Sequence, residues 1–319
     1  MRGTGNRLRP AALKSLRMKS IRTNVLLAFA FCGCATASPE KPSSVAPASE
    51  PPPALDGFSE PESVRYDAKA DQYFVSNING DPFAADHNGF ISRVSPDGKM
   101  IALRFIDGHG APDGLSAPKG TALVGRTLYV ADIDRVRLYD ADTGEARGSI
   151  EVPGASLLND IDAGPDGTVY VTDSGVRRDG AAFAPTGTEA IYALAQGAPI
   201  RRIASGQFGF PNGILWNDGK LEMVTLGGGE WITFSLTGDI LQRTKLPKGK
   251  LDGIVKRETG ELLVSSWDGT AIYGVRPGAA AKTILAGVPA ADIGYDTKRA
   301  RLLIPNMMDN RISFVQLPL

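Results

Sequence analysis

One pattern recurs along the chain and constrains its fold more than any other feature of the sequence. Each copy has a polar residue in a short loop, an apolar stretch, a turn that often contains Gly, and a second apolar stretch. The six copies begin, at spacings of 57, 40, 53, 40 and 40 residues, at Glu62, Lys119, Asn159, Asn212, Asp252 and Asp292. Periods near 40 residues with several short strands are typical of β-propellers. The six copies therefore predict an all-β, six-bladed β-propeller with four antiparallel strands per blade.

The turns and strands inside the copies agree with this prediction. Residues 165–167, 217–219 and 258–260 end in Gly and lie between the first two apolar stretches of their units, where a hairpin turn is needed. Residues 168–172 and 261–265 alternate in the manner of half-buried strands. Two small β domains remain the alternative arrangement.

The first 37 residues have the order of a bacterial export signal. Seven basic residues and no acidic one occupy positions 1–24, and an apolar run at 25–31 is followed by small residues. This run is far shorter than the roughly 20 residues of a membrane-spanning helix, so we expect the leader to be cleaved. Cleavage before Cys34 would give a lipoprotein lipidated at that residue, whereas cleavage after Ala37 would give simple secretion. Met18 is an alternative start of translation.

A spacer connects the leader to the repeats. Residues 38–57 contain six prolines among Ser, Ala and Glu, a composition that cannot bury a core, and we expect a flexible linker before a propeller at 58–319. Both cysteines, Cys32 and Cys34, lie in the leader. The folded part is therefore expected to contain no disulfide, thiolate metal site or cysteine nucleophile.

The charge balance excludes one class of partner. After residue 24 the remaining 28 basic residues face all 35 acidic ones, a net charge of −7. An acidic body argues against nucleic acid as a partner. We expect an exported monomer of the cell envelope that acts on a small molecule and meets the membrane only through a lipid anchor.

The repeat also predicts where a functional site lies. The innermost strand of each propeller blade runs along the central channel, so the leading polar residues of the six copies should converge there as one ring. Loops at 77–88 and 174–188 lengthen the first and third units on the same face. Long loops over a ring of polar groups predict a covered pocket.

The charges of the ring predict a cation. Glu62, Asp252 and Asp292 outweigh Lys119 by two negative charges, and carboxylates about 4 Å apart repel by roughly 4 kcal/mol at an effective dielectric constant near 20. Carboxylate and amide oxygens suit calcium or magnesium better than zinc. The residues that would supply four such oxygens are Glu62, Asn159, Asn212 and Asp252. Alternatively, the carboxylates pair with Lys119 or hold raised pKa values, and the Asn side chains cap turns.

Short motifs at these four positions resemble a known family. Residues 62–64 (Glu-Ser-Val), 159–160 (Asn-Asp), 211–213 (Pro-Asn-Gly) and 251–253 (Leu-Asp-Gly) are similar to the metal-binding motifs of the senescence-marker-protein, gluconolactonase and luciferin-regenerating-enzyme family of six-bladed propellers. The resemblance covers residues 58–319. It implies one divalent cation, usually calcium, bound by Glu62, Asn159, Asn212 and Asp252, and hydrolysis of lactones or related esters. No match to the substrate-contacting arginine of the sugar-lactone members is found, which leaves the substrate open.

Several side chains are candidates for roles around such an ion. Asp252 is both a ligand and the candidate general base for water. Lys119 either stabilises developing negative charge or neutralises Asp292, and we favour the second role. His87 and His109 lie in loops expected on the open face, where one of them acts as a proton shuttle, by analogy with paraoxonase, or both are inert loop residues. Three tryptophans, Trp216, Trp231 and Trp267, are expected to pack between blades.

A non-catalytic propeller is the competing hypothesis. In that case the ion holds the blades together, and the open face binds a ligand or a protein. The fold alone does not decide between an enzyme and a binding module.

Overall fold

A computed structural model describes residues 54–109, 114–180 and 182–318 of the chain. The predicted signal at 1–37, its Cys34, and the linker up to residue 53 lie outside the described residues. All described residues fall within a single compact unit. Within these ranges no helix has both the length and the apolar character needed to span a membrane.

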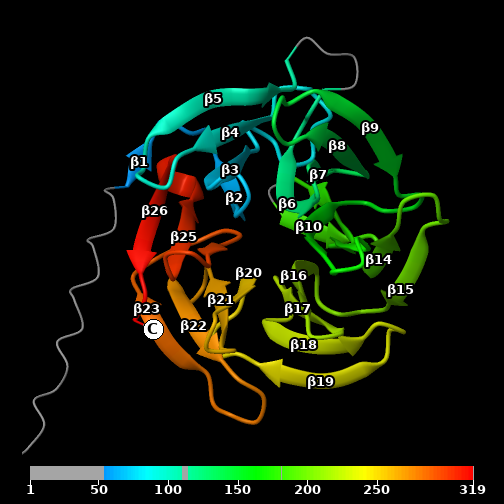
Figure 1. Cartoon of the computed structure of the whole chain (residues 1–319). Helices are drawn as coiled ribbons and strands as arrows, with labels where there is room; N and C mark the ends of the chain where they lie inside the picture. The colour runs from blue at the N-terminus through cyan, green and yellow to red at the C-terminus, as the bar shows by residue number, and fades with distance from the viewer. Residues whose placement is uncertain (1–53, 110–113, 181, 319) are drawn as a thin grey trace, which may run out of the picture. The chain divides into compact units, whose positions relative to one another are not determined.

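Six antiparallel sheets of four strands surround a central axis (Figure 1). This arrangement confirms the predicted all-β, six-bladed propeller. In five blades the strand nearest the axis comes first in the sequence and the later strands step outward, and in the last blade the outer strand is β1. The inner strands are β2 (Pro61–Asp67), β6 (Pro118–Val124), β10 (Leu158–Ala163), β16 (Pro211–Asn217), β20 (Leu251–Lys256) and β24 (Gly294–Asp296).

The remaining strands complete the blades in the same order. The second strands are β3 (Gln72–Asn77), β7 (Thr127–Asp132), β11 (Val169–Asp173), β17 (Lys220–Thr225), β21 (Leu262–Ser266) and β25 (Arg301–Asn306). The third strands are β4 (Phe90–Val94), β8 (Arg135–Asp140), β14 (Ala190–Leu194), β18 (Glu230–Ser235), β22 (Ala271–Val275) and β26 (Arg311–Gln316). The outer strands are β5 (Met100–Asp107), β9 (Ala146–Glu151), β15 (Arg201–Ser205), β19 (Ile240–Lys245), β23 (Lys282–Ala286) and β1 (Leu55–Asp56).

The last blade takes its outer strand from the other end of the propeller sequence. β1 pairs with β26, with Leu55 opposite Ile312. The predicted linker at 38–57 includes both residues of β1, which stand three and two positions before the expected start of the propeller at 58. They join the blade because Leu55 packs on the apolar cluster that contains Phe58 and Ile312. The pairing closes the ring of blades.

The hydrophobic core lies between neighbouring blades. One cluster joins Val224 and Trp231 of the fourth blade to Val264 and Tyr273 of the fifth. Trp231 is buried, and its Nε1 donates to Glu222 at 2.8 Å. Its packing between blades is thus as the sequence predicts. Because each blade is covered on both faces, its middle strands are buried along their whole length. Every residue of β11 and β21 is buried, so the prediction of half-buried strands from the alternation at 168–172 and 261–265 is wrong.

The predicted turns have the conformation that favours glycine. Gly167, Gly219 and Gly260 have φ of 82°, 79° and 76°. These left-handed values cost glycine little, and the three residues connect the first and second strands of their blades.

Two insertions meet above the channel. The first is the loop at 78–89, and the second contains a hairpin of β12 (Val176–Asp179) and β13 (Ala182–Pro185). Arg178 donates to Asp81 Oδ1 at 2.7 Å. The Phe83 and Phe183 rings lie 5.5 Å apart, and the Arg178 guanidinium lies 5.2 Å from the Phe83 ring. We call this contact between the two insertions the clasp.

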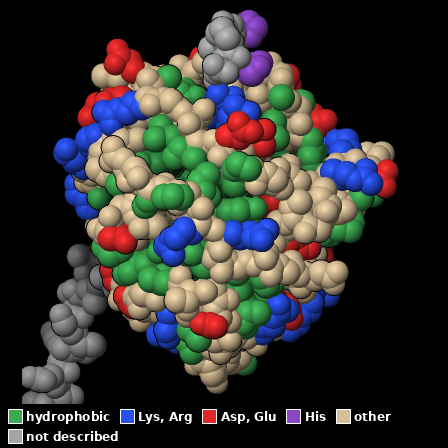
Figure 2. Space-filling view, turned by 90° about the vertical axis from the view of Figure 1, so that its right-hand side faces the viewer, with side chains coloured by type: hydrophobic (Ala, Val, Ile, Leu, Met, Phe, Trp, Pro, Cys, Tyr) green, Lys and Arg blue, Asp and Glu red, His purple; other side chains and the backbone are tan. Residues whose placement is uncertain are grey.

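Acidic and basic side chains are interspersed over the side of the propeller seen in Figure 2, rather than gathered by sign. A short 3₁₀-helix, η1 (Met307–Asp309), follows β25 in the last blade.

Candidate functional site

The inner strands present one polar residue each at a fixed position. In β2, β6, β10, β16 and β20 the pairing with the second strand shifts immediately after the first residue, as at a β-bulge. A bulge leaves a residue out of the regular pairing and re-aims its side chain. The residues at the second position of these five strands are Glu62, Lys119, Asn159, Asn212 and Asp252. All five line one cavity of about 580 Å³, which we call the axial cavity.

Asp292 does not line the axial cavity, and the prediction of a ring of six is wrong at this position. Ala291 lines that cavity instead, while Asp292 lines a neighbouring cavity of about 260 Å³ with Arg65 and Asp160. The cause is a late start of the inner strand in the last blade. β24 begins at Gly294, and the Asp292 N–H donates to the carbonyl of Glu62 at 2.9 Å.

Four buried oxygens of the axial cavity have no hydrogen-bond partner. They are Glu62 Oε2, Asn159 Oδ1, Asn212 Oδ1 and Asp252 Oδ1. Eight buried side-chain polar atoms of the described residues lack a partner, and these four make up half of them. A buried, unpaired polar group costs about 1–3 kcal/mol. Four such atoms in one place therefore indicate a site that a positive group or donor would complete.

The two amide side chains are held with their oxygens free. Asn159 Nδ2 donates to Ser174 Oγ at 3.1 Å, and Asn212 Nδ2 donates to the Leu251 carbonyl at 3.3 Å. Because each NH₂ group is engaged, each carbonyl oxygen is the end left for a ligand. Groups that orient a metal ligand in this way are a regular part of protein metal sites.

The donor set fits a hard divalent cation. Two carboxylate and two amide oxygens are ligands that calcium accepts, with water or substrate completing its six to eight positions. No group of three or more His, Cys, Asp or Glu side chains placed to hold a metal occurs in the described ranges. The four oxygens include no nitrogen or sulfur ligand, whereas zinc sites favour these ligands.

Trp267 orients Asp252, one of the four candidate ligands. The prediction that this tryptophan only packs between blades missed this contact. Its Nε1 donates to Asp252 Oδ2 at 2.6 Å, and its ring lines the axial cavity. This bond occupies one oxygen of Asp252 and leaves the other free. Trp267 directly follows β21. This position, at the cavity end of a second strand, is the feature of the sequence that indicates a place in the site.

We expect Trp267→Phe to weaken calcium binding by about 10-fold to 100-fold, because removing a partner that orients a metal ligand has this effect. Isothermal titration calorimetry measures the affinity. Trp231→Phe is the matched control, since Trp231 Nε1 also donates to a carboxylate, that of Glu222, away from the axial cavity. Equal affinities for the two variants would contradict this role of Trp267.

Burial shapes the electrostatics of the site. It raises the pKa of Glu62 well above its usual value, with repulsion from Asp252 and Asp292 adding to the effect. Burial also raises the pKa of Asp252 to about 7, while the hydrogen bond from Trp267 opposes the rise. A positive charge placed between these carboxylates would reverse both effects.

Lys119 does not neutralise Asp292, contrary to the favoured prediction. Its Nζ donates to the carbonyls of Pro82 at 3.1 Å and Ala117 at 3.0 Å. Burial lowers the pKa of Lys119, and attraction to Glu62 opposes this. Among the described residues the cation that acts on Asp292 is Arg65, which partly offsets the effect of burial in raising the pKa of Asp292 to about 7.

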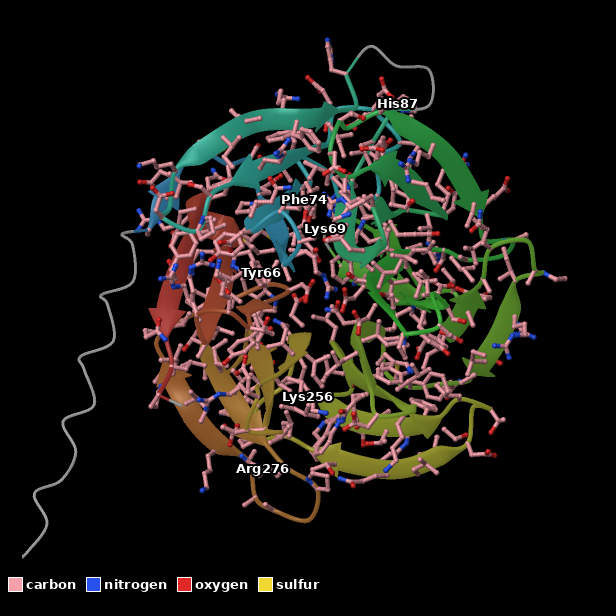
Figure 3. The ribbon with its side chains drawn as sticks, viewed as in Figure 1. Tyr66, Lys69, Phe74, His87, Lys256 and Arg276 are labelled. Atoms are coloured by element: carbon pink, nitrogen blue, oxygen red, sulfur yellow. The ribbon has the colours of Figure 1, made fainter. Side chains whose placement is uncertain are left out.

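Neither histidine belongs to the described residues that line the axial cavity. His87 Nδ1 lies 3.0 Å from the Gly114 carbonyl, and the side chain lines a separate cavity with Asp132. Figure 3 shows His87 at the outer rim, much farther from the axis than Tyr66. His109 is exposed at the end of a described range. The structure therefore gives no support to a proton shuttle through either residue.

The fold is shared with solved structures of several functions. A gluconolactonase from Xanthomonas campestris is similar over 86% of this chain and 99% of its own, with a TM-score of 0.63 and 20% identity. A virginiamycin B lyase from Staphylococcus aureus is similar over 83% of this chain and 88% of its own, with a TM-score of 0.56 and 14% identity. A chain of a nidogen/laminin complex is similar over 76% and 82%, with a TM-score of 0.56 and 19% identity. No protein-family model matches the chain, and neither does any curated protein sequence.

Proposed function

We propose that the protein is a hydrolase of lactones or related esters that depends on a divalent cation, with calcium as the ion. The observation that carries this proposal is the set of four unpaired, buried oxygens at the bottom of the axial cavity. The six-bladed fold shared with the Xanthomonas gluconolactonase is compatible with it.

The cation would be held by Glu62, Asn159, Asn212 and Asp252. When bound, it would supply Lewis-acid polarisation of a substrate carbonyl. Calcium acidifies water far less than zinc does, so a protein base is needed as well. The remaining steps are assigned to side chains of this chain.

Asp252 is the candidate base. Its free Oδ1 lines the cavity while Trp267 fixes its orientation. Asp252 accepts a proton from a water molecule as the water oxygen bonds to the carbonyl carbon. The ester C–O bond then breaks, and the proton passes to the leaving oxygen, which gives a hydroxy acid from a lactone. A positioned general base typically contributes 10²–10⁴-fold to the rate.

Lys119 is assigned the role of stabilising the negative charge that develops on the carbonyl oxygen of the substrate during hydrolysis. Its ammonium lines the axial cavity beside the four oxygens, and two of its protons are engaged by the Pro82 and Ala117 carbonyls. These two bonds fix the position of Nζ and leave one proton for the substrate.

The alternative is a propeller that binds a ligand or protein without catalysis. The structural neighbour from a nidogen/laminin complex shares the fold. The experiment that decides is a panel of lactones and aryl esters assayed in calcium, in EDTA, and in EDTA followed by excess calcium. The enzyme proposal requires turnover that EDTA removes and calcium restores. Calcium binding without turnover of any compound would favour the binding module, and turnover indifferent to EDTA would remove the cation from the mechanism.

We also propose that the protein resides in the cell envelope as a lipoprotein anchored at Cys34. The support is the order of basic, apolar and small residues at the start of the sequence. Expressed with its leader in a bacterial host, the wild-type protein should fractionate with membranes and carry the added mass of lipid. Cys34→Ser should be free of lipid by intact mass. Recovery of unlipidated wild-type protein cleaved after Ala37 would instead indicate simple secretion.

A further inference from the structure

The wall of the axial cavity above the four oxygens follows a second positional rule. In five blades, the residue directly after the second strand lines the cavity. These residues are Ile78, Ser174, Leu226, Trp267 and Met307. All but Ser174 are apolar or aromatic, so the polar floor is surrounded by an apolar wall.

The roof of the cavity is apolar as well. Phe83 and Phe183 of the clasp line it, as does Phe210, whose φ of 64° is unusual for a bulky residue. Backbone strain of this kind persists where the surrounding structure fixes a side chain. Phe183 is 47% exposed, and Met308, which also lines the cavity, is 76% exposed. Large apolar side chains at a cavity mouth are available to a ligand.

Most polar groups of the wall already have protein partners, and the free donors that remain are the third proton of Lys119 and the exposed ammonium of Lys250. Ser174 Oγ donates to the Pro211 carbonyl at 2.6 Å and accepts from Asn159. The carboxylate of Glu60 accepts from the Gly80 N–H, and Lys250 pairs with Asp268 at 3.2 Å. The single indole N–H of Trp267 is donated to Asp252.

A polyhydroxylated substrate would therefore bury several hydroxyl groups without partners. A site lined by engaged polar groups and apolar side chains disfavours each such hydroxyl by roughly tenfold. A hydrocarbon chain in the same place gains about threefold to fourfold per buried methylene. The lining thus discriminates between these two classes of substrate.

We propose that the site takes a lactone or ester with an extended apolar substituent rather than a sugar lactone. The carbonyl lies at the four oxygens, and the hydrocarbon lies along Leu226 and Trp267 toward Phe83, Phe183 and Phe210. The reaction class rests on the function proposed above, whereas the preference for an apolar ligand rests on the lining alone.

The test compares γ-lactones of increasing alkyl length, from γ-butyrolactone to γ-undecalactone, with D-glucono-δ-lactone. We expect kcat/KM to rise about threefold per methylene until the cavity is filled, and to be at least about tenfold lower for the sugar lactone. A second readout uses γ-lactams with the same alkyl chains, whose affinity is measured by calorimetry in calcium. Their binding should strengthen in parallel.

A pair of matched variants tests whether the preference for long alkyl chains arises at Phe183. Phe183→Ala should lower kcat/KM for the longest lactone and affinity for the longest lactam by about tenfold, and should lower kcat/KM for γ-butyrolactone much less, because that substrate has no alkyl chain to contact the ring. Ile240→Ala is the control, because Ile240 is also 47% exposed but lies on the outer strand β19. It should alter neither measurement.

The outcomes separate the two proposals. Hydrolysis with no dependence on chain length, or with preference for the sugar lactone, would overturn the apolar assignment and leave the hydrolase standing. Lactam binding that strengthens with chain length, without turnover of any lactone, would support the apolar assignment and overturn the hydrolase. Lactam binding that is flat across the series would overturn the assignment whether or not turnover is seen.

Discussion

Asp252→Asn is expected to lower kcat/KM for lactone hydrolysis by about 10³-fold, within the range measured for loss of a general base. The variant removes the base and one of the two carboxylates of the site together. Because Trp267 Nε1 donates to Asp252 Oδ2 at 2.6 Å, the amide oxygen of the Asn would take that bond. Its NH₂ group would then face the cavity, where a donor opposes cation binding. Steady-state kinetics in saturating calcium measures the loss.

The control for this prediction is Asp292→Asn. It makes the same chemical change in a buried carboxylate of the channel that does not line the axial cavity. We expect kcat/KM to stay within about threefold of wild type, since the Asp292 side chain offers no oxygen to the axial cavity and its carboxylate acts on Glu62 only by charge repulsion. Thermal unfolding of both variants shows whether each is folded. Equal losses in the two variants would mean that channel charge in general, and not Asp252 in particular, sustains activity.

Calcium is expected to raise the Tm of the protein more at pH 8 than at pH 5. Without a cation, burial raises the folded-state pKa of Asp252 from 3.8 to about 7. The folded protein therefore binds more protons than the unfolded chain between these pH values, and stability falls as the pH rises through that window. At pH 8 the penalty from Asp252 alone is on the order of 4 kcal/mol. Calcium removes it by stabilising the ionised form.

Differential scanning calorimetry from pH 5 to 8, in EDTA and in calcium, measures this effect. The Tm in EDTA should fall by about 5 °C across the range, and calcium should restore most of the loss. In Asp252→Asn the pH dependence in EDTA should be weaker, because this position no longer titrates. A calcium effect on Tm that is the same at every pH would show that the carboxylates of the cavity are already ionised without it.

The phase of the repeat was the most informative part of the sequence. It predicted the number of blades, the inner strands, and the five inner-strand residues that line the axial cavity, because each of these is the second residue of its strand. Asp292 broke the pattern because β24 is short and starts late. The engagement of Trp267 with Asp252 could not be read from residue type, since a tryptophan both packs and donates.

The apolar roof was the part least accessible from sequence. Loop lengths at 77–88 and 174–188 predicted a cover, but the contact between Phe83 and Phe183 depends on how two distant loops fold toward each other. His87 illustrates the same limit. It belongs to the covering loop, yet its ring turns to the Gly114 carbonyl at the rim. Side chains on strands follow a period, whereas side chains on loops follow local packing.

Because of the bulge at the second residue of five inner strands, the residues that determine the chemistry of the site are not the residues that hold the blades together. A side chain at such a position contributes little to strand pairing, so it can be exchanged with small consequence for the backbone. The second blade already illustrates this freedom, with an ammonium at Lys119 where the other four residues of the set offer oxygen. Five residue positions thus determine the net charge of the axial cavity and the number of side chains there that can bind a cation. A lineage could gain, lose or replace a cation by point mutation while the blades stay as they are.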